Sequence, residues 1–545
     1  MHFRSNSVRV IDIFCGAGGF SEGFRQAGFE VIWGVDKWEP AVITHRANHP
    51  SSQTVMYDVE RLSLLPDEEF DEMIPDAEVI IGSPPCAAFS NSNKSGKGDK
   101  AEGIRLIEAF LRIVARKKWK SGSILRYWIL ENVPNSENYI QDSYTAKYLG
   151  LEGDQILQVK NTSSGIYNAV YYGVPSRRKR YFCGKFPHPE KTITDKADIV
   201  LLKEVLNRLG KPNEKYSEKI KDPNYEFELD GKDVSDHHYI QKLARHQWKT
   251  AKRMKQDKGY MGKMAFPENI EKPARTVMAS MTFGARESMI YGNGRGSYRA
   301  PTIREIASLM SFPIDYRFYG KSIGLKYRLV GNAVPPKMAY ALAKAITLKE
   351  NIKPRETYQP IIHRDNGHFF DLNGQKISPA REKRRHPKSR FKYHIPYLIV
   401  DTYRVELTNH HSDFQNLDFK WGVEIHRSQG PKARVFTPNQ SRSVFTEEEL
   451  QKMDEFCNFL EKSLVSYDKF QMIYRMTTYE RRKQSLIGPF ELLYAVRDLI
   501  DNLARTSNMS IRIKSPTAPF YIPRKIGIGY YVLCRAINEM EKLSL

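Results

Sequence analysis

The sequence predicts an α/β fold in which residues 1–187 form a parallel, doubly wound sheet, followed by a smaller domain and an additional α+β domain. Short apolar runs alternate with helix-compatible stretches over residues 8–187, which is the rhythm of such a sheet. The first run leads into a glycine-rich turn, and the later runs end in polar, glycine or proline residues. Ligands of doubly wound sheets bind beyond the carboxyl ends of the strands, so these terminal polar residues are the candidate site residues.

Five strands are expected before residue 134, with helices between them. They are VRVIDIFC (8–15), EVIWGVD (30–36), TVMYDV (54–59), EVIIGSPP (78–85) and YWILENV (127–133). The pattern then changes twice. Residues 188–270 are polar and weakly periodic, whereas 271–345 regain an ordered pattern that ends in a proline and an Ala-rich helix. A basic linker is expected at 351–395, and residues 396–545 begin with strand-like runs and continue with helical stretches.

Net charge is the most informative feature of the composition. The 545 residues contain 85 Lys and Arg against 63 Asp and Glu, a formal charge of +22. Such a charge attracts polyanions, of which nucleic acid is the commonest large one in a cytoplasm. Residues 1–350 contribute +12 and residues 351–545 contribute +10, so the charge is not confined to a tail.

The cysteines and the apolar runs indicate a cytoplasmic protein. The five cysteines are far apart and lack CxxC spacing, which argues against a disulfide framework or a structural zinc site. No apolar run approaches the roughly 18–20 residues of a membrane helix. The N-terminal residues lack the apolar segment of a secretory signal.

The first strand ends in DIFCGAGGF (12–20), where Gly16, Gly18 and Gly19 precede a helix. Glycines let a ligand approach the backbone and a helix N-terminus offers free N–H groups, although an ordinary tight turn has a similar composition. Two acidic strand ends favour a ligand. Asp36 stands where a carboxylate accepts hydrogen bonds from ribose, and Asp58 stands where it accepts an adenine amino group, although either aspartate could instead cap the following helix. Together they predict an adenosine-containing cofactor.

Three further motifs carry reactive or basic groups. GSPPCAAFS places Cys86 in a rigid Pro-Pro turn at the functional edge, which is more typical of a nucleophile than of a core cysteine. ILENVP places Glu131 near the same edge, as a general acid in a dry pocket or as a turn residue. In YYGVPSRRKRYF a basic run has either a solvated face or, because aromatic residues flank it, alternate arginines that face inward and suit a phosphate or a base carbonyl.

In identity and order these motifs resemble the DNA cytosine-5 methyltransferase family of bacterial restriction–modification systems. DIFCGAGGFS, GSPPCAAFS, LENV, GVPSRRKRYF, RTVMAS, PTIREIASLMSFP and VGNAVPP follow one another between residues 8 and 348. The resemblance implies a Rossmann-like S-adenosylmethionine-dependent methyltransferase sheet with a catalytic domain formed by 1–187 and 321–350. It also implies a small target-recognition domain at 188–320, whose polar segment reads double-stranded DNA in the major groove.

The resemblance also assigns residue roles. Cys86 is the nucleophile that adds to ring carbon 6 of a cytosine flipped out of the duplex, and Glu131 binds ring N3 and the amino group. Arg178 and Arg180 match two arginines near the cytosine carbonyl and the nucleophile. No metal ligand is implied. The residues implied to bind S-adenosyl-L-methionine are Phe14, Gly16, Gly18, Gly19, Phe20, Asp36, Asp58, Pro85 and Asn332.

A few positions depart from the family pattern. Ala87 and Ser176 stand where the family usually has glutamine, and Lys37 stands where an aromatic residue is common, with Trp38 one place later. None of these changes removes a group that the chemistry needs. We therefore expect an active enzyme, with a cognate restriction endonuclease as a further partner.

Residues 351–545 lie outside the resemblance and leave several functions open. Glu424 and His426 occupy alternate positions of a strand-like run as metal ligands would, but we expect them to be surface residues. A fused restriction endonuclease, an additional DNA-binding domain and an oligomerising module all stay open. A tRNA cytosine-5 methyltransferase is the alternative for the catalytic part, and the long C-terminal third disfavours it because that branch is a single short unit. A catalytically silent homologue is disfavoured because all four predicted catalytic residues are present.

Overall fold

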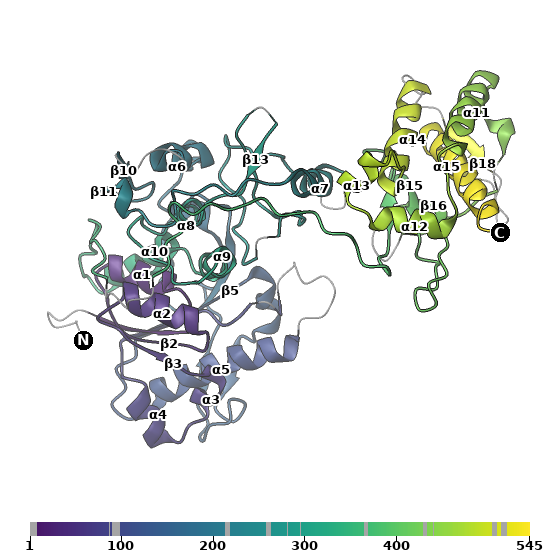
Figure 1. Cartoon of the computed structure of the whole chain (residues 1–545). Coiled ribbons are helices and arrows are strands. Elements are labelled where there is room, and N and C mark those ends of the chain that lie inside the picture. The colour runs from purple at the N-terminus through teal and green to yellow at the C-terminus, as the bar shows by residue number, and fades with distance from the viewer. Residues whose placement is uncertain are drawn as a thin grey trace. The chain divides into compact units, whose positions relative to one another are not determined.

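The chain forms two compact units in this computed structural model (Figure 1). Unit 1 comprises Met1–Leu243 and Pro267–Pro379, and unit 2 comprises Ala244–Phe266 and Ala380–Leu545. The basic segment predicted as a linker is therefore divided between the units. The structure describes residues 8–86, 88–89, 99–212, 218–257, 263–280, 282–294, 296–363, 369–428, 433–439, 441–503, 510–513 and 520–545.

A seven-stranded sheet organises unit 1. In spatial order its strands are β3 (Gln53–Met56), β2 (Glu30–Asp36), β1 (Arg9–Ile13), β4 (Val79–Gly82), β5 (Tyr127–Asn132), β9 (Lys179–Lys185) and β8 (Gly165–Asn168). The strands from β3 to β5 are parallel, as predicted. β9, however, runs antiparallel to both β5 and β8. The sheet is therefore mostly parallel, with the five predicted strands paired as expected and the antiparallel β9 added between β5 and β8.

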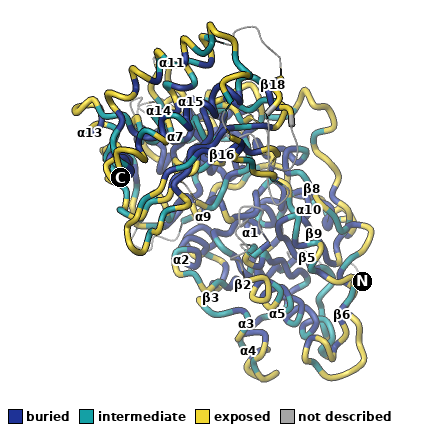
Figure 2. Tube along the Cα trace, turned by 90° about the vertical axis from the view of Figure 1, so that its right-hand side faces the viewer, coloured by how far each residue is buried: buried dark blue, intermediate teal, exposed yellow. Residues whose placement is uncertain are grey.

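Helices cover both faces of this sheet. On one face α1 (Gly19–Gln26) and α10 (Pro336–Lys349) share a core with the strands, and on the other face lie α5 (Lys100–Trp119) and α3 (Val59–Ser63). The central strands of the sheet run through the buried interior, whereas the edge strands are only partly buried (Figure 2). α1 and α10 cross so closely that a Cβ added to Gly23 would lie 2.4 Å from the Cβ of Ala339. The late helix α10 thus completes the layer begun by the N-terminal residues.

The rest of unit 1 surrounds a third core, and the weakly periodic part of the sequence contains helices and strands. These elements are α6 (Leu202–Leu209), β10 (Lys219–Lys221), β11 (Glu228–Asp230), β12 (Tyr291–Gly292), β13 (Tyr298–Arg299), α8 (Ile303–Leu309) and α9 (Ile323–Asn332). The other α-helices and strands in the described part of unit 1 are α2 (Glu39–Asn48), α4 (Asp67–Met73), β6 (Ser143–Thr145) and β7 (Ile156–Gln158).

Unit 2 contains strands first and helices later, as predicted. Its antiparallel sheet is β14 (Lys392–His394), β15 (Tyr403–Thr408), β16 (Gly422–Arg427) and β17 (Arg434–Phe436). The α-helices that follow this sheet are α11 (Glu447–Glu461), α12 (Tyr467–Arg475), α13 (Thr478–Lys483), α14 (Pro489–Leu503) and α15 (Arg524–Lys542), with a hairpin of β18 (Ser510–Ile513) and β19 (Phe520–Pro523). Glu424 and His426 are 8% and 4% exposed, so the expectation that they are surface residues was wrong.

A helix from the predicted target-recognition region belongs to unit 2. This helix is α7 (Arg245–Gln256), and Asp257 at its end accepts hydrogen bonds from His394 Nε2 at 2.8 Å and from Tyr393 Oη at 2.9 Å. The guanidinium of Arg253 lies 3.7 Å from the centroid of the Phe490 ring. These contacts fix α7 to β14 and to the start of α14.

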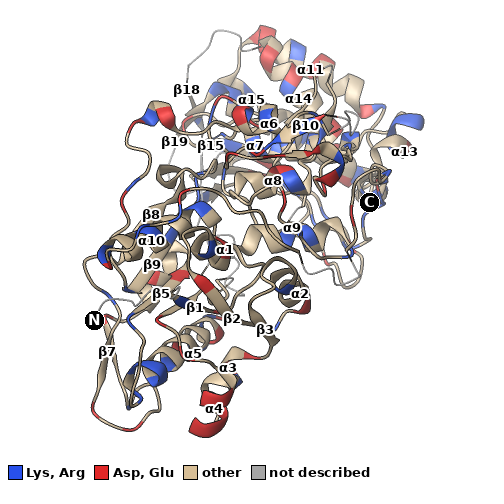
Figure 3. Ribbon diagram, turned by 90° about the vertical axis from the view of Figure 1, so that its left-hand side faces the viewer, with Lys and Arg blue, Asp and Glu red and all other residues tan. Residues whose placement is uncertain are grey.

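The excess of positive charge is concentrated in unit 2. Its two segments contain 35 Lys and Arg against 20 Asp and Glu, which leaves +15 of the total +22 there and +7 in unit 1. Acidic side chains gather on α4 and basic ones on α13 (Figure 3). Among the described helices, none has both the length and the apolar character that crossing a bilayer requires.

Candidate active site

Glu131 lies at the carboxyl end of β5, and its carboxylate meets groups from the two neighbouring strands. Ser83, directly after β4, donates its hydroxyl to Glu131 Oε2 at 2.5 Å. Arg180, at the start of β9, places Nε 2.9 Å from Glu131 Oε1. The carboxylate is 95% buried, so the arginine supplies the charge that a buried carboxylate needs. Three adjacent strand ends therefore bring these side chains together.

Cys86 follows β4 by four residues and lies in the turn that the two prolines form. The amide of Asn132 donates to the carbonyl of Pro84 at 3.1 Å, which holds the turn against the end of β5. Burial raises the pKa of the half-buried Cys86 thiol, the nearby Arg180 lowers it and Glu131 raises it further, with a net increase. The thiol is therefore protonated at neutral pH in the free protein. The other four cysteines are buried free thiols.

Arg178 is 2% exposed and binds backbone rather than an acidic side chain. Its Nη1 donates to the carbonyl of Val277 at 3.1 Å, and its Nη2 donates to those of Gly331 and Ala333 at 3.1 and 3.0 Å. Burial, with repulsion by Arg180, lowers the pKa of Arg178 to about 9. The guanidinium thus joins the RTVMAS and VGNAVPP motifs to the start of β9. Its predicted place beside a cytosine carbonyl stays a prediction.

The glycines of the first loop have different surroundings. A Cβ added to Gly18 would lie 2.5 Å from Tyr316 Oη, and one added to Gly19 would lie 2.2 Å from the carbonyl of Val334. These two glycines are required by close packing. Gly16 has a φ of +53°, and the nearest atom to an added Cβ is 4.0 Å away. Of the three, Gly16 leaves open space beside the loop, which is what a ligand needs.

Two carboxylates lie next to this loop. Asp36 accepts the backbone N–H of Gly16 at 3.0 Å and that of Trp38 at 2.9 Å. Burial raises the pKa of Asp36, and these backbone N–H groups oppose that increase. Asp58 caps α3 by accepting the N–H of Glu60 at 2.9 Å, and its other oxygen lies 3.6 Å from Lys37 Nζ. The helix-cap alternative for Asp58 is thus observed, and its second oxygen faces solvent and Lys37.

The other predicted cofactor residues have unlike environments. Phe14 has a φ of +61°, unusual for a residue with a side chain, and it is nearly buried. The Phe20 ring lies in the core, with centroids 5.8 Å from Phe24 and 6.4 Å from Phe182. Pro85 and Asn332 are exposed. Ala87 lies outside the described residues.

A buried polar chain beneath the loop was missed by the sequence reasoning. Asp12 accepts the Ser21 hydroxyl at 2.7 Å, Ser21 Oγ lies 3.0 Å from His45 Nε2, and His45 Nδ1 lies 2.7 Å from Thr54 Oγ1. Burial raises the pKa of Asp12 to about 7. The signal was present in DIFCGAGGFS, since a strand, a turn and a helix bring the Asp and the Ser together. Ser83 was missed in the same way, inside GSPPC.

Comparisons with known proteins agree with this arrangement. The family model described as C-5 cytosine-specific DNA methylase matches residues 8–348. The type II methyltransferase M.NgoPII of Neisseria gonorrhoeae is 26% identical over 358 residues, which cover 63% of this chain and 96% of that protein. M1.HphI of Haemophilus parahaemolyticus is 30% identical over 372 residues, covering 63% and 88%. M.HgiDI of Herpetosiphon aurantiacus is 28% identical over 348 residues, covering 62% and 94%.

The family model extends over more than half of the chain and includes every element that contributes to the edge at Glu131. The chain belongs to the C-5 cytosine-specific DNA methylase family and is a DNA cytosine-5 methyltransferase of the restriction–modification type.

Proposed function

We propose that this enzyme transfers a methyl group from S-adenosylmethionine to carbon 5 of a cytosine flipped out of duplex DNA, through a covalent adduct at Cys86. The modification would protect a specific sequence from a cognate restriction endonuclease. The observation that carries the proposal is the convergence of Cys86, Glu131 and Arg180 at one edge of the sheet. A nucleophile beside a buried, positioned carboxyl group is what covalent activation of a ring requires.

The residues around the first loop fit a nucleoside cofactor. Gly16 leaves space beside the loop, and Asp36 and Asp58 follow adjacent parallel strands, so both carboxylates lie at the same edge. S-adenosylmethionine, when bound, supplies an electrophilic methyl group. Asp36 would hold the ribose and the second oxygen of Asp58 would accept the adenine amino group.

The chain's own groups would then act on the base in sequence. The Cys86 thiol would give its proton to a base and its sulfur would bond ring carbon 6. The Glu131 carboxyl group, protonated in this step, would donate its O–H to N3 and accept an amino N–H, which favours the charge that develops there. Carbon 5 would become nucleophilic and take the methyl group, whose sulfonium carrier would leave as a neutral thioether. The proton on carbon 5 leaves to a base, the sulfur–carbon bond breaks, and the aromatic ring is restored. Arg180 keeps the Glu131 carboxyl group aimed at the base throughout.

Unit 2 would contribute to holding the DNA. It carries +15 of the formal charge, and it contains α7 from the predicted target-recognition region. Lysines and arginines on such a surface bind phosphates without reading sequence.

Labelled S-adenosylmethionine with either duplex DNA or tRNA tests the proposal. We expect label in 5-methylcytosine of DNA. Label in tRNA alone would replace DNA by RNA as the substrate, and label in neither would contradict the proposal.

A further inference from the structure

One face of the sheet in unit 2 is charged although it is buried. The β15–β16 register pairs Glu406 with Glu424 and Arg404 with His426, so these four side chains lie on the same face. Glu406, Glu424 and His426 are 7%, 8% and 4% exposed. The other face carries the alternate apolar side chains that enter the core with α15, namely Val405, Leu407, Val423 and Ile425.

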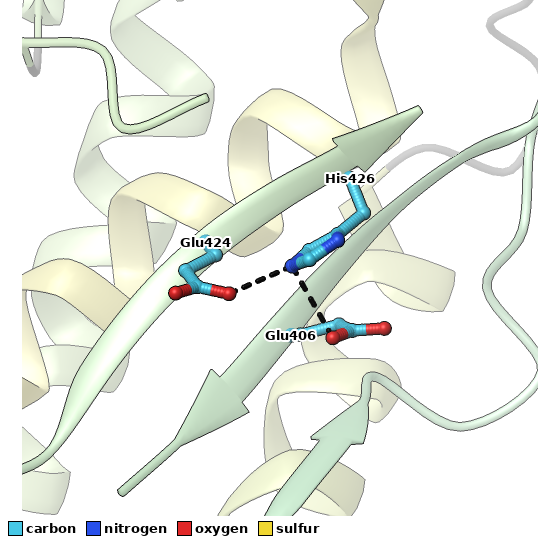
Figure 4. Close-up of side chains that lie close together, drawn as sticks. All are labelled: Glu406, Glu424 and His426. Atoms are coloured by element: carbon cyan, nitrogen blue, oxygen red, sulfur yellow. Dashed lines mark hydrogen bonds and ion pairs between the residues drawn. The ribbon is translucent and has the colours of Figure 1, made fainter. Parts of the chain in front are cut away.

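The three buried groups converge on one point (Figure 4). His426 Nε2 lies 2.7 Å from Glu424 Oε2 and 3.3 Å from Glu406 Oε2. One ligand atom from each residue lies within 4.8 Å of the other two. Since both carboxylates face the same imidazole nitrogen, one ion can contact all three side chains.

Glu406 provides an independent indication of a ligand. Its Oε2 is buried and, within the described residues, has no hydrogen-bond partner. The nearest opposite charges are His426 Nε2 at 3.3 Å and Lys392 Nζ at 3.6 Å. Burying a carboxylate oxygen without a hydrogen bond costs free energy, and a cation at this point would remove that cost.

The surrounding groups leave the site an entrance. Arg404 Nε lies 2.6 Å from Glu406 Oε1, which leaves Oε2 of that carboxylate for the cluster. The side chains of His411 and Lys392 are 64% and 33% exposed, so both can move to admit an ion from solvent.

We propose that Glu406, Glu424 and His426 bind one divalent first-row metal ion, with Mn²⁺ or Zn²⁺ preferred over Mg²⁺. Two carboxylates and one imidazole form a mixed oxygen and nitrogen donor set, and an imidazole ligand favours such ions over Mg²⁺. Three protein ligands leave a coordination position open for water or an anion, as in catalytic rather than structural sites. The site lies wholly in unit 2 and does not depend on the proposed methyl transfer. In the competing arrangement, Lys392 and Arg404 alone balance the carboxylates and no metal binds.

Titration of the full chain with Mn²⁺, followed by electron paramagnetic resonance, distinguishes the two arrangements. We expect one bound ion per chain whose spectrum shows coupling to one imidazole nitrogen, displaced by Zn²⁺. His426→Gln and Glu424→Gln should each weaken binding by about tenfold or more, the loss typical of altered metal sites. The matched control is His386→Gln, the same substitution at an exposed histidine of unit 2, which should bind Mn²⁺ as the wild type does.

The proposal is overturned if the wild-type chain binds no Mn²⁺ at millimolar concentration, or if the bound ion shows no nitrogen coupling. Equal binding by the wild type and by both folded variants would also overturn it. Circular dichroism establishes that the variants are folded. The nitrogen coupling is measured on the wild-type chain. It therefore tests the proposed metal site even when a variant does not fold.

Discussion

Arg180 Nε lies 2.9 Å from Glu131 Oε1, whereas Arg178, two residues earlier, donates to backbone carbonyls. Two arginines of one motif therefore have different structural partners and different roles. One neutralises the buried carboxylate at the end of β5, and the other joins two later motifs to the sheet. Substitution at the two positions should separate an effect on catalysis from an effect on stability.

Glu131→Gln tests the carboxyl group at the reacting edge. The amide keeps the size of the side chain but cannot transfer a proton or carry charge, so we expect the methyl-transfer rate to fall by about 100-fold to 10,000-fold. Single-turnover transfer to DNA measures this, with DNA affinity measured separately. Glu152→Gln, in an exposed loop, is the matched control. A rate within threefold of wild type would exclude a chemical role for Glu131.

Arg178→Lys tests whether the hydrogen bonds of Arg178 to three backbone carbonyls stabilise unit 1. A lysine keeps the charge but cannot supply a fork of donors to three carbonyls, so we expect unit 1 to lose about 2 kcal/mol of unfolding free energy or more. Urea unfolding measures the loss, and the exposed Arg177→Lys is the control.

Arg180→Lys should instead lower the transfer rate more than the stability. If both variants lost transfer rate and unfolding free energy in the same proportion, the assignment of a structural role to Arg178 and a catalytic role to Arg180 would be wrong.

Cys86 should be the cysteine that reagents reach in the folded protein, because the other four are buried. The raised pKa of Cys86 means that little thiolate exists at pH 7, and the thiolate is the reactive form. Alkylation by iodoacetamide should therefore accelerate as pH rises from 7 to 9, by close to tenfold per unit while pH stays below the pKa. Peptide mapping by mass spectrometry locates the product, and Cys86→Ser should abolish it. A rate independent of pH would contradict the raised pKa.

A buried ion pair should anchor α9 to the segment around Asp236 in unit 1. Lys326 Nζ lies 2.7 Å from both carboxylate oxygens of Asp236, and neither side chain is exposed to solvent. Asp236→Asn leaves a buried ammonium without its partner and should cost about 3–5 kcal/mol. Asp236 has a φ of +59°, which asparagine tolerates, so backbone strain does not confuse the result.

Urea unfolding of this variant is compared with that of Glu228→Gln, which breaks the exposed ion pair with Lys219. The control should have an unfolding midpoint at nearly the same urea concentration as the wild type. Equal midpoints for the two variants would mean that the buried pair contributes no more than a surface pair.

The sequence predicted the parallel strands and placed Cys86 and Glu131 at one edge, because the carboxyl ends of parallel strands share an edge. It placed Arg180 near Cys86 only through the family resemblance. It did not predict that β9 is antiparallel, since the residues of a strand do not determine which strand it pairs with or in which direction. Nor did it predict that α7 belongs to unit 2, which depends on contacts of Asp257 with residues 136 and 137 positions away. Glu424 and His426 alternate with apolar residues as surface residues do, so sequence alone could not show that both faces of that sheet are covered.

Covalent catalysis by Cys86 is the central claim, and a duplex carrying 5-fluorocytosine at the target position tests it most directly. Fluorine on carbon 5 cannot leave as a proton, so the sulfur–carbon 6 bond should persist after methyl transfer. With S-adenosylmethionine present, we expect a denaturation-resistant protein–DNA complex whose attachment maps to Cys86, and no complex with Cys86→Ser. Methylation of ordinary DNA without any such complex, or with attachment at another residue, would contradict the claim.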